Sequence, residues 1–271
     1  MSLARRTLRR DRWWLQPAIT ASVLLSFVVY STWAAFQNSD YFAKPYLSPF
    51  YSPCIASVCN HARNVANASH NWAQPAQHLQ HVPNVGIIGT WWPITPALWI
   101  LIVPLGFRMT CYYYRKSYYR SIWASPPACA VGEPHKKYSG ETKFPLIMQN
   151  AHRYFFYLGL ILNAILTYDA VIAFQDWKGN WGHAGLGTLI MVVNAVLLWA
   201  YSLSCHSCRH IVGGRLKHFS RHPIRFKFWG VVSKLNAKHM QIAWASLVFV
   251  ALTDVYIRLL ASGTFHDPRF F

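Results

Sequence analysis

The sequence predicts an all-α integral membrane protein, with five transmembrane helices in the cell (plasma) membrane. The prediction rests on long apolar runs, few charged residues and basic residues in blocks. The 271 residues are 54% hydrophobic and 13% charged, against about 25% charged residues in an ordinary soluble domain. The formal net charge is +18. Because the basic blocks alternate with apolar runs, we expect them to face anionic lipids or an acidic partner, and no nucleic acid.

Five apolar stretches are long enough to cross about 30 Å of hydrocarbon, which takes roughly 20 helical residues. The first, LQPAITASVLLSFVVYSTWAAF, follows a basic N-terminus, and we expect it to be retained as a helix because no clear signal-peptide cleavage site follows it. The second contains Pro93, Pro96 and Pro104, which membrane helices tolerate better than soluble ones. In one domain, 1–271, the expected helices are about 15–36, 91–113, 153–174, 183–204 and 240–261.

The Lys and Arg content of the connecting segments predicts the orientation of the chain. The N-terminal stretch and the segments 114–148 and 205–235 are rich in basic residues, whereas the loop 37–90 has only Lys44 and Arg63. Basic segments stay on the cytoplasmic side. We therefore expect a cytoplasmic N-terminus and both basic segments in the cytoplasm. The loop 37–90 and the C-terminus are expected outside.

The six cysteines divide between the two sides of the membrane. Cys54 and Cys59 fall in the outer loop, where an oxidising environment allows a disulfide between them. The other four fall on the cytoplasmic side, where disulfides are rare and clustered thiols more often bind metal. These four are Cys111, Cys129, Cys205 and Cys208.

Two cysteines and two histidines are expected at one depth, just inside the cytoplasmic boundary. Cys205 and Cys208 follow the fourth helix and are three residues apart, a spacing that places both sulfurs on one helical face. His152 precedes the third helix and His239 precedes the fifth. Because these helices alternate in direction, all four side chains reach the same membrane face. Two further residues are substitutes for members of this set: Cys111 and His210.

Three kinds of cofactor suit such a set. A structural zinc ion takes two thiolates and two imidazoles, although a helical membrane frame has little need of it. A haem b takes only the two imidazoles, as axial ligands. A Rieske-type [2Fe–2S] cluster takes two thiolates on one iron and two imidazoles on the other. A transporter or a structural anchor without a redox cofactor is the alternative of another class, but the sequence has no internal repeat.

Five long stretches carry a resemblance to a known family. They are PYLSPFYSPC, FRMTCYYYRKSYYRSIWASPPACAV, KYSGETKFPLIMQNAHRYFFY, SCHSCRHIVGG and LNAKHMQIAWASLVFVALTDVYIRLLASG. They resemble the membrane-anchor subunit of actinobacterial (mycobacterial-type) succinate dehydrogenase, and the resemblance covers most of the chain after about residue 45. It implies a complex II assembly in which a flavoprotein oxidises succinate and an iron–sulfur subunit docks on the cytoplasmic face. Electrons would then pass through this anchor to menaquinone, and a higher oligomer is compatible with this interpretation.

The chain departs from the five-helix anchors that bind two haems, because its first helix has no histidine. A mixed ligand set raises the potential of a [2Fe–2S] cluster from around −400 mV to roughly −150 to +300 mV. That range suits transfer from an iron–sulfur subunit to a quinone. We therefore expect a Rieske-type cluster held by Cys205, Cys208, His152 and His239, with a haem b on the two histidines as the alternative.

A quinone site and a proton path are also expected on these helices. A quinone needs an apolar slot with a few hydrogen-bond donors. The candidates near the cytoplasmic boundary are Tyr113, Tyr114, Gln149, Arg153 and Trp244. Two acids lie inside helices toward the outer side. Asp254 has Arg258 four residues on, a spacing that indicates an ion pair. Asp169 has no such local partner, so we expect it to move protons between the outer face and the quinone.

Overall fold

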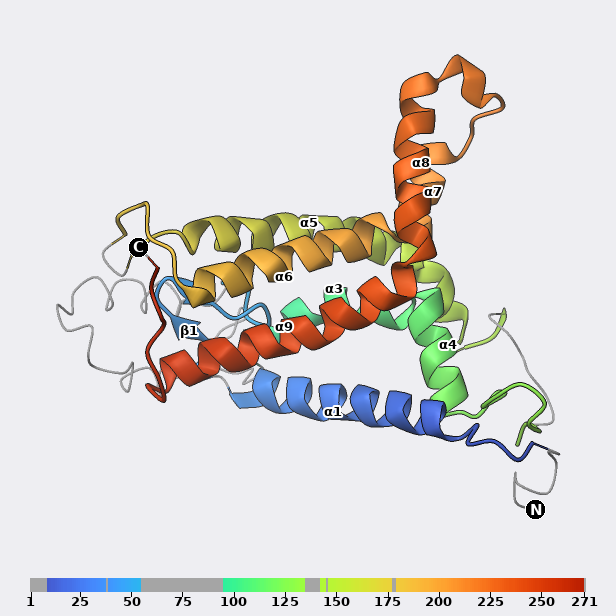
Figure 1. Ribbon diagram of the computed structural model, residues 1–271, viewed down its shortest axis with the longest axis horizontal. Helices are drawn as coiled ribbons and strands as arrows, with labels where there is room; N and C mark the ends of the chain where they lie inside the picture. The colour runs from blue at the N-terminus through green and yellow to red at the C-terminus, as the bar shows by residue number, and fades with distance from the viewer. Residues whose placement is uncertain are drawn as a thin grey trace.

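Long apolar helices dominate the structure, a computed structural model that describes residues 9–37, 39–54, 95–134, 142–144, 146–176 and 179–270. Four helices within these residues are long and apolar enough to cross a membrane. They are α1 (Leu15–Gln37), α5 (His152–Ile172), α6 (Leu186–Leu203) and α9 (His239–Ala261). They lie lengthwise beside one another (Figure 1), and the predicted all-α membrane fold is confirmed.

The second expected helix, 91–113, is broken in the structure. Helix α3 spans Pro96–Met109, helix α4 spans Tyr112–Ser121, and the two meet at an angle of 80°. Counting this bent pair as one span gives a fifth membrane crossing. The expectation of one helix up to residue 113 is wrong because Cys111 has an extended backbone conformation, which ends the helical path. Helix α4 instead lies across one end of the bundle and packs against α1 (Figure 1).

Short elements cover the two ends of the bundle. At the end where α3 and α6 finish, which we call the cysteine end, lie η4, α7, η5 and α8 (Figure 1). Their bounds are Leu146–Ala151, His206–Gly213, Phe219–Arg221 and Pro223–Ala237. At the opposite end, which we call the Asp254 end, β1 (Phe42–Ala43) pairs antiparallel with β2 (Tyr46–Leu47), in the register Phe42 to Leu47. Helix α8 projects sideways, at a steep angle to the long helices (Figure 1).

The apolar core runs along the contacts that α6 makes with α5 and α9, and that α5 makes with α3. At the cysteine end it contains Phe107, Phe156 and Leu247. Many apolar side chains on the outside of the long helices are exposed, among them Val29 and Ile161. Exposed apolar surface on this scale marks an interaction surface, and on helices of spanning length it is the surface that faces lipid.

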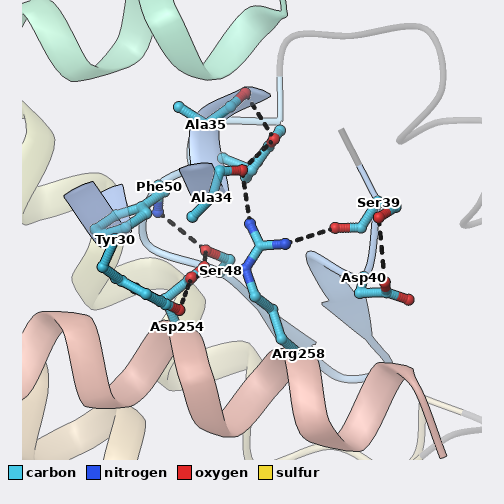
Figure 2. A network of polar contacts seen from close by, with 10 residues as sticks. Tyr30, Ala34, Ala35, Ser39, Asp40, Ser48, Phe50, Asp254 and Arg258 are labelled. Atoms are coloured by element: carbon cyan, nitrogen blue, oxygen red, sulfur yellow. Dashed lines mark hydrogen bonds and ion pairs between the residues drawn. The ribbon is translucent and has the colours of Figure 1, made fainter. Parts of the chain in front are cut away.

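A buried ion pair fastens α9 to α1 at the Asp254 end (Figure 2). Asp254 and Arg258 are 0% and 7% exposed, and Nε of Arg258 lies 2.7 Å from Oδ2 of Asp254. The guanidinium also donates to the backbone carbonyls of Ala34 and Ser39, at 2.9 Å each. Two hydroxyl groups donate to the carboxylate, those of Tyr30 and Ser48. The ion pair expected from the spacing of the two residues is therefore present.

Replacing Asp254 with Ala should leave the charge of Arg258 buried without its carboxylate. Removing one partner of a buried pair costs about 3–5 kcal/mol, so we expect a clear fall in the thermal denaturation temperature of the purified protein. The double variant D254A/R258M should recover part of that loss. As a control, Asp11→Ala breaks only the exposed pair with Arg9 and should leave the temperature unchanged. A D254A protein as stable as the wild type would contradict this role.

Candidate functional site

Two helix breaks at the cysteine end share one backbone geometry. The first separates α3 from α4, and the second separates α6 from α7. Thr110 and Ser204 close the first helix of each pair, with φ and ψ of −83° and −9° in one case and −79° and −6° in the other. Cys111 and Cys205 follow with extended backbones. Their φ and ψ angles are −66° and 132° for Cys111 and −67° and 147° for Cys205, and each is the N-cap residue of the next helix. Each break therefore presents a hydroxyl residue followed directly by a cysteine.

Each of these cysteines faces a histidine that begins another helix. Nε2 of His152, the first residue of α5, lies 3.1 Å from the sulfur of Cys205. Nε2 of His239, the first residue of α9, lies 3.4 Å from the sulfur of Cys111. Both cysteines and His239 are at most 2% exposed, and His152 is half-buried. The structure thus brings together two thiol–imidazole pairs from four different parts of the chain.

The second ring nitrogen of each histidine contacts the hydroxyl group of the other break. Nδ1 of His152 lies 2.8 Å from Oγ1 of Thr110. Nδ1 of His239 lies 2.6 Å from Oγ of Ser204. The contacts are therefore crossed. The first break gives its hydroxyl to His152 and its thiol to His239, and the second break does the reverse.

Two aromatic rings lie between the imidazoles. Phe107 stacks on His152 and contacts Tyr201, and Tyr201 stacks on His239, each with a centroid separation of 5.1 Å. Tyr201 is 2% exposed, and its hydroxyl group makes no hydrogen bond of good geometry within the described part of the chain, although the thiol of Cys111 lies close to it. A buried hydroxyl without a partner costs about 1–3 kcal/mol. A bound group that accepts a hydrogen bond here would remove that cost.

Arg108 adds a positive charge to the same layer. Its guanidinium donates to the hydroxyl group of Tyr114 and, at 3.1 Å, to that of Ser246. It also lies 4.8 Å from the ring centroid of Tyr201. Across the described residues, no carboxylate forms an ion pair with Arg108. Because its partners are neutral, the charge of Arg108 favours a bound group that carries or gains negative charge.

Arg108→Lys should lower the thermal stability of the protein. The planar guanidinium reaches two hydroxyl groups and a ring face at once, which a lysine cannot do, and a hydrogen bond from a charged group contributes about 1.5–3 kcal/mol. The matched control is Arg153→Lys, since Arg153 is exposed and contacts only His210 in this part of the structure. Equal thermal denaturation temperatures for R108K and R153K would contradict this stabilising role of Arg108.

Two of the predicted ligand residues, Cys208 and His210, lie outside the thiol–imidazole pairs. Cys205 is the N-cap residue of α7 with an extended backbone, so it does not belong to one regular helix with Cys208. Cys208 packs in the apolar cluster of the cysteine end, and among the described contacts neither imidazole bonds to its sulfur. His210 instead contacts Arg153 at 3.3 Å. Cys111, predicted as a substitute ligand, lies beside His239.

As they stand in the described residues, the donor atoms form two separate thiol–imidazole pairs and not one site for a single metal ion. Burial raises the pKa of the Cys205 thiol to about 12, so a thiolate at this position needs a bound cation. Among the residues described, no group of three or more His, Cys, Asp or Glu surrounds one metal position. A zinc ion requires such a group.

Three of the predicted quinone residues lie on the side of His239. The ring of Tyr113 meets that of His239 edge-on, with centroids 5.3 Å apart. The ring centroid of Trp244 lies 6.1 Å from that of Tyr114. Tyr114 is buried, and its hydroxyl donates to the carbonyl of Ala243 at 2.6 Å. Tyr113 and Trp244 are half-buried, so these two can meet a molecule that enters from the lipid.

The other two predicted quinone residues lie on the side of His152. The side-chain amide of Gln149 donates to the hydroxyl group of Tyr118 at 2.6 Å. Its carbonyl oxygen is buried and has no partner within the described residues. Arg153 is exposed and in contact with His210. Among the described contacts, none joins Gln149 or Arg153 directly to the three candidates beside His239.

Asp169 lies at the Asp254 end of α5, far from the two pairs. A rise of about 1.5 Å per residue puts it on the order of 25 Å from His152. The hydroxyl group of Ser52 donates to its carboxylate. The carboxylate also lines a pocket of about 230 Å³, together with Lys44 and Gln175.

The predicted disulfide falls partly outside the described residues. Cys54 is disulfide-bonded. Cys59 lies outside the residues that the structure describes. The four cysteines expected on the cytoplasmic side are free: Cys111, Cys129, Cys205 and Cys208.

Sequence reasoning missed four residues of this site: Arg108, Thr110, Tyr201 and Ser204. For Arg108 there was a signal, because a cation inside an apolar run is a functional candidate. Thr110 and Ser204 each directly precede a cysteine at the end of an apolar run, and this repeated pair of residue types was readable. Tyr201 carries no local signal, since the isolation of its hydroxyl group depends on tertiary packing.

Comparison with known proteins shows what the whole chain resembles. The family model "Actinobacterial succinate dehydrogenase subunit SdhC" matches residues 15–263, a range that includes both breaks and both histidines. A solved chain of the "Mycobacterium smegmatis Sdh1 complex in the apo form" is 49% identical, with a TM-score of 0.81. The match covers 98% of this chain and 94% of that chain. No curated protein matches the sequence.

Proposed function

The chain belongs to the family of actinobacterial succinate dehydrogenase subunit SdhC, and we propose that it carries electrons to menaquinone by way of a Rieske-type [2Fe–2S] cluster. As a membrane anchor of complex II it is a multi-pass cell-membrane protein, and its partners are the flavoprotein and iron–sulfur subunits. Succinate oxidation takes place in those partner subunits. The observation that carries the proposal is the meeting of two thiols and two imidazoles at the cysteine end.

The residues that would hold the cluster are Cys111, Cys205, His152 and His239. Two further observations support this ligand set. The isolated hydroxyl group of Tyr201 has the chemistry to donate to a sulfur atom placed among these residues. Bound there, the cluster would supply a one-electron carrier with a potential of roughly −150 to +300 mV. The charge of Arg108 favours the added negative charge of the reduced state.

A haem b on His152 and His239 has less support. A haem b would take only the two imidazoles and leave both thiols without a role. In the structure a thiol sulfur lies within 3.4 Å of the Nε2 atom of each histidine. This pairing favours a group that takes both sulfur and nitrogen ligands.

Cys111→Ala and Cys208→Ala form a matched pair that tests the ligand set. In the purified complex, we expect C111A to lose a [2Fe–2S] EPR signal that is additional to those of the iron–sulfur subunit. Its iron content should fall by the two atoms of that cluster, and quinone reduction should stop. C208A should keep the signal, the iron and the activity, because Cys208 bonds to neither histidine in the described contacts.

The opposite outcome, loss in C208A and retention in C111A, would reject the ligand set read from the structure. A haem absorption band in the wild-type complex that disappears in His239→Ala would replace the cluster by the haem alternative. His210→Ala serves as a histidine control and should leave the EPR signal unchanged. Recovery of all three subunits in each preparation verifies that the variant has assembled.

We place the quinone beside His239, in contact with Tyr113 and Trp244. Both side chains are half-buried and lie next to the second thiol–imidazole pair. They combine an apolar ring with a hydrogen-bond donor, the combination that a quinone site needs. On the other side, Gln149 and Arg153 are engaged with Tyr118 and His210, which leaves the His239 side as the better supported position.

Asp169→Asn tests whether this carboxylate moves protons for quinone reduction. Because a positioned side chain speeds proton transfer by roughly 100-fold or more, we expect succinate:quinone activity to fall by about 100-fold. The EPR signal should not change. Asp176→Asn is the control, since Asp176 lies near the same end and bonds to Asn180. Full activity in D169N would remove Asp169 from the proton path.

A further inference from the structure

We infer that both histidines bind the cluster through Nε2, and that Thr110 and Ser204 are the positioning residues that make this atom available. The inference rests on the proposed function, since it concerns how the cluster would be held. It assigns a role to two hydroxyl groups that are not ligands themselves.

Each hydroxyl group has one proton, and a backbone carbonyl already accepts it. Oγ1 of Thr110 donates to the carbonyl oxygen of Gly106 at 2.7 Å. Oγ of Ser204 donates to the carbonyl oxygen of Tyr201 at 2.9 Å. Since a hydroxyl group is a single donor with two acceptor lone pairs, both oxygens are left to accept a hydrogen bond from the histidine that faces them.

The proton of each imidazole is therefore on Nδ1. Nδ1–H of His152 donates to Thr110, and Nδ1–H of His239 donates to Ser204, over the short distances given above. In a neutral imidazole the other nitrogen then carries a free lone pair. That nitrogen is Nε2, the atom that points at a thiol sulfur in both pairs. Without metal, each thiol donates its proton to this lone pair.

Cluster binding would remove only the two thiol protons. The sulfurs of Cys111 and Cys205 would hold iron as thiolates, and their two S–H protons would pass to solvent. The imidazoles would lose no proton, because their Nε2 lone pairs are already free and their Nδ1–H bonds to the hydroxyl groups would remain. Groups behind a ligating histidine of this kind fix its tautomer and ring orientation. Here Thr110 and Ser204 perform that task from the ends of α3 and α6.

Because the contacts are crossed, each helix break contributes a residue to one thiol–imidazole pair and positions the histidine of the other. Thr110 orients His152 and directly precedes Cys111, while Ser204 orients His239 and directly precedes Cys205. A displacement of either break therefore moves the thiol of one pair and the imidazole of the other. We conclude that the ends of α3 and α6 set the ligand geometry as a unit.

The chain offers a matched control for these hydroxyl groups. Thr167 donates to the carbonyl oxygen of Asn163 at 2.7 Å and accepts from the indole nitrogen of Trp199 at 2.8 Å. It thus bridges a helix carbonyl and a ring N–H, as Thr110 and Ser204 do. No histidine takes part in this bridge. Thr167→Val therefore removes the same kind of bond without touching the candidate site.

Isotope labelling of histidine in the intact complex tests the inference without a mutation. One sample carries ¹⁵N at Nδ1 of all histidines and another carries it at Nε2. Pulsed EPR of the reduced complex then reveals which nitrogen couples strongly to the cluster. We expect strong coupling from Nε2 and weak coupling from Nδ1. Strong coupling from Nδ1 of either histidine would overturn the inference while leaving the proposed cluster intact.

The absence of any additional [2Fe–2S] signal from the wild-type complex would be a different failure. It would overturn the proposed function, and with it the inference, whereas Nδ1 coupling overturns the inference alone. The labelling measurement therefore distinguishes failure of the proposed cluster from failure of the inference about Nε2.

The variants Thr110→Val and Ser204→Ala measure what the hydroxyl groups contribute. Loss of a group behind a metal ligand typically weakens metal binding by about 10- to 100-fold. We expect the additional EPR signal to disappear at correspondingly lower concentrations of an iron chelator than in the wild type. Thr110→Ser should restore the wild-type response, and T167V should match the wild type. Equal chelator resistance in T110V, S204A and T167V would deny the two hydroxyl groups a positioning role.

Discussion

The structure of the cysteine end depends on two hydroxyl–imidazole–thiol chains that cross between two helix breaks. Thr110, His152 and Cys205 form one chain, and Ser204, His239 and Cys111 form the other. These contacts require α3 and α6 to stop one residue before the hydroxyl and require α5 and α9 to begin with histidine. Four helix ends are thereby held at one depth. The same requirement explains the 80° turn between α3 and α4, because the chain must leave the helical path at Cys111.

The two ends of the bundle carry different polar chemistry. At the Asp254 end, carbonyl and hydroxyl groups hydrogen-bond to the ion pair of Asp254 and Arg258, so this pair has a structural role (Figure 2). At the cysteine end, the hydroxyl group of Tyr201 is left without a partner within the described residues, and Arg108 has only neutral ones. Buried polar groups are normally satisfied. The incomplete set at the cysteine end therefore favours a bound group there, and the complete set at the other end does not.

Hydropathy and charge predict most of the frame, because spanning helices must be long and apolar whatever they pack against. The shared depth of His152, Cys205 and His239 also follows from the sequence, since alternating helices bring their ends together. The choice between Cys111 and Cys208 does not follow. The Cys-x-x-Cys spacing favours Cys208, and only the break after Met109 turns Cys111 toward His239. That break depends on tertiary contacts, as do the aromatic rings between the imidazoles, so no local pattern reveals either.

We propose above all that a mixed thiolate–imidazole [2Fe–2S] cluster lies in the membrane anchor. Optical and EPR spectra of the purified, unmodified complex, recorded before and after reduction, test this proposal most directly. We expect a reduced [2Fe–2S] signal with the low average g value of mixed ligation, in addition to the signals of the iron–sulfur subunit, and no haem band in the visible. A haem band, or a reduced spectrum fully explained by the iron–sulfur subunit, would contradict it.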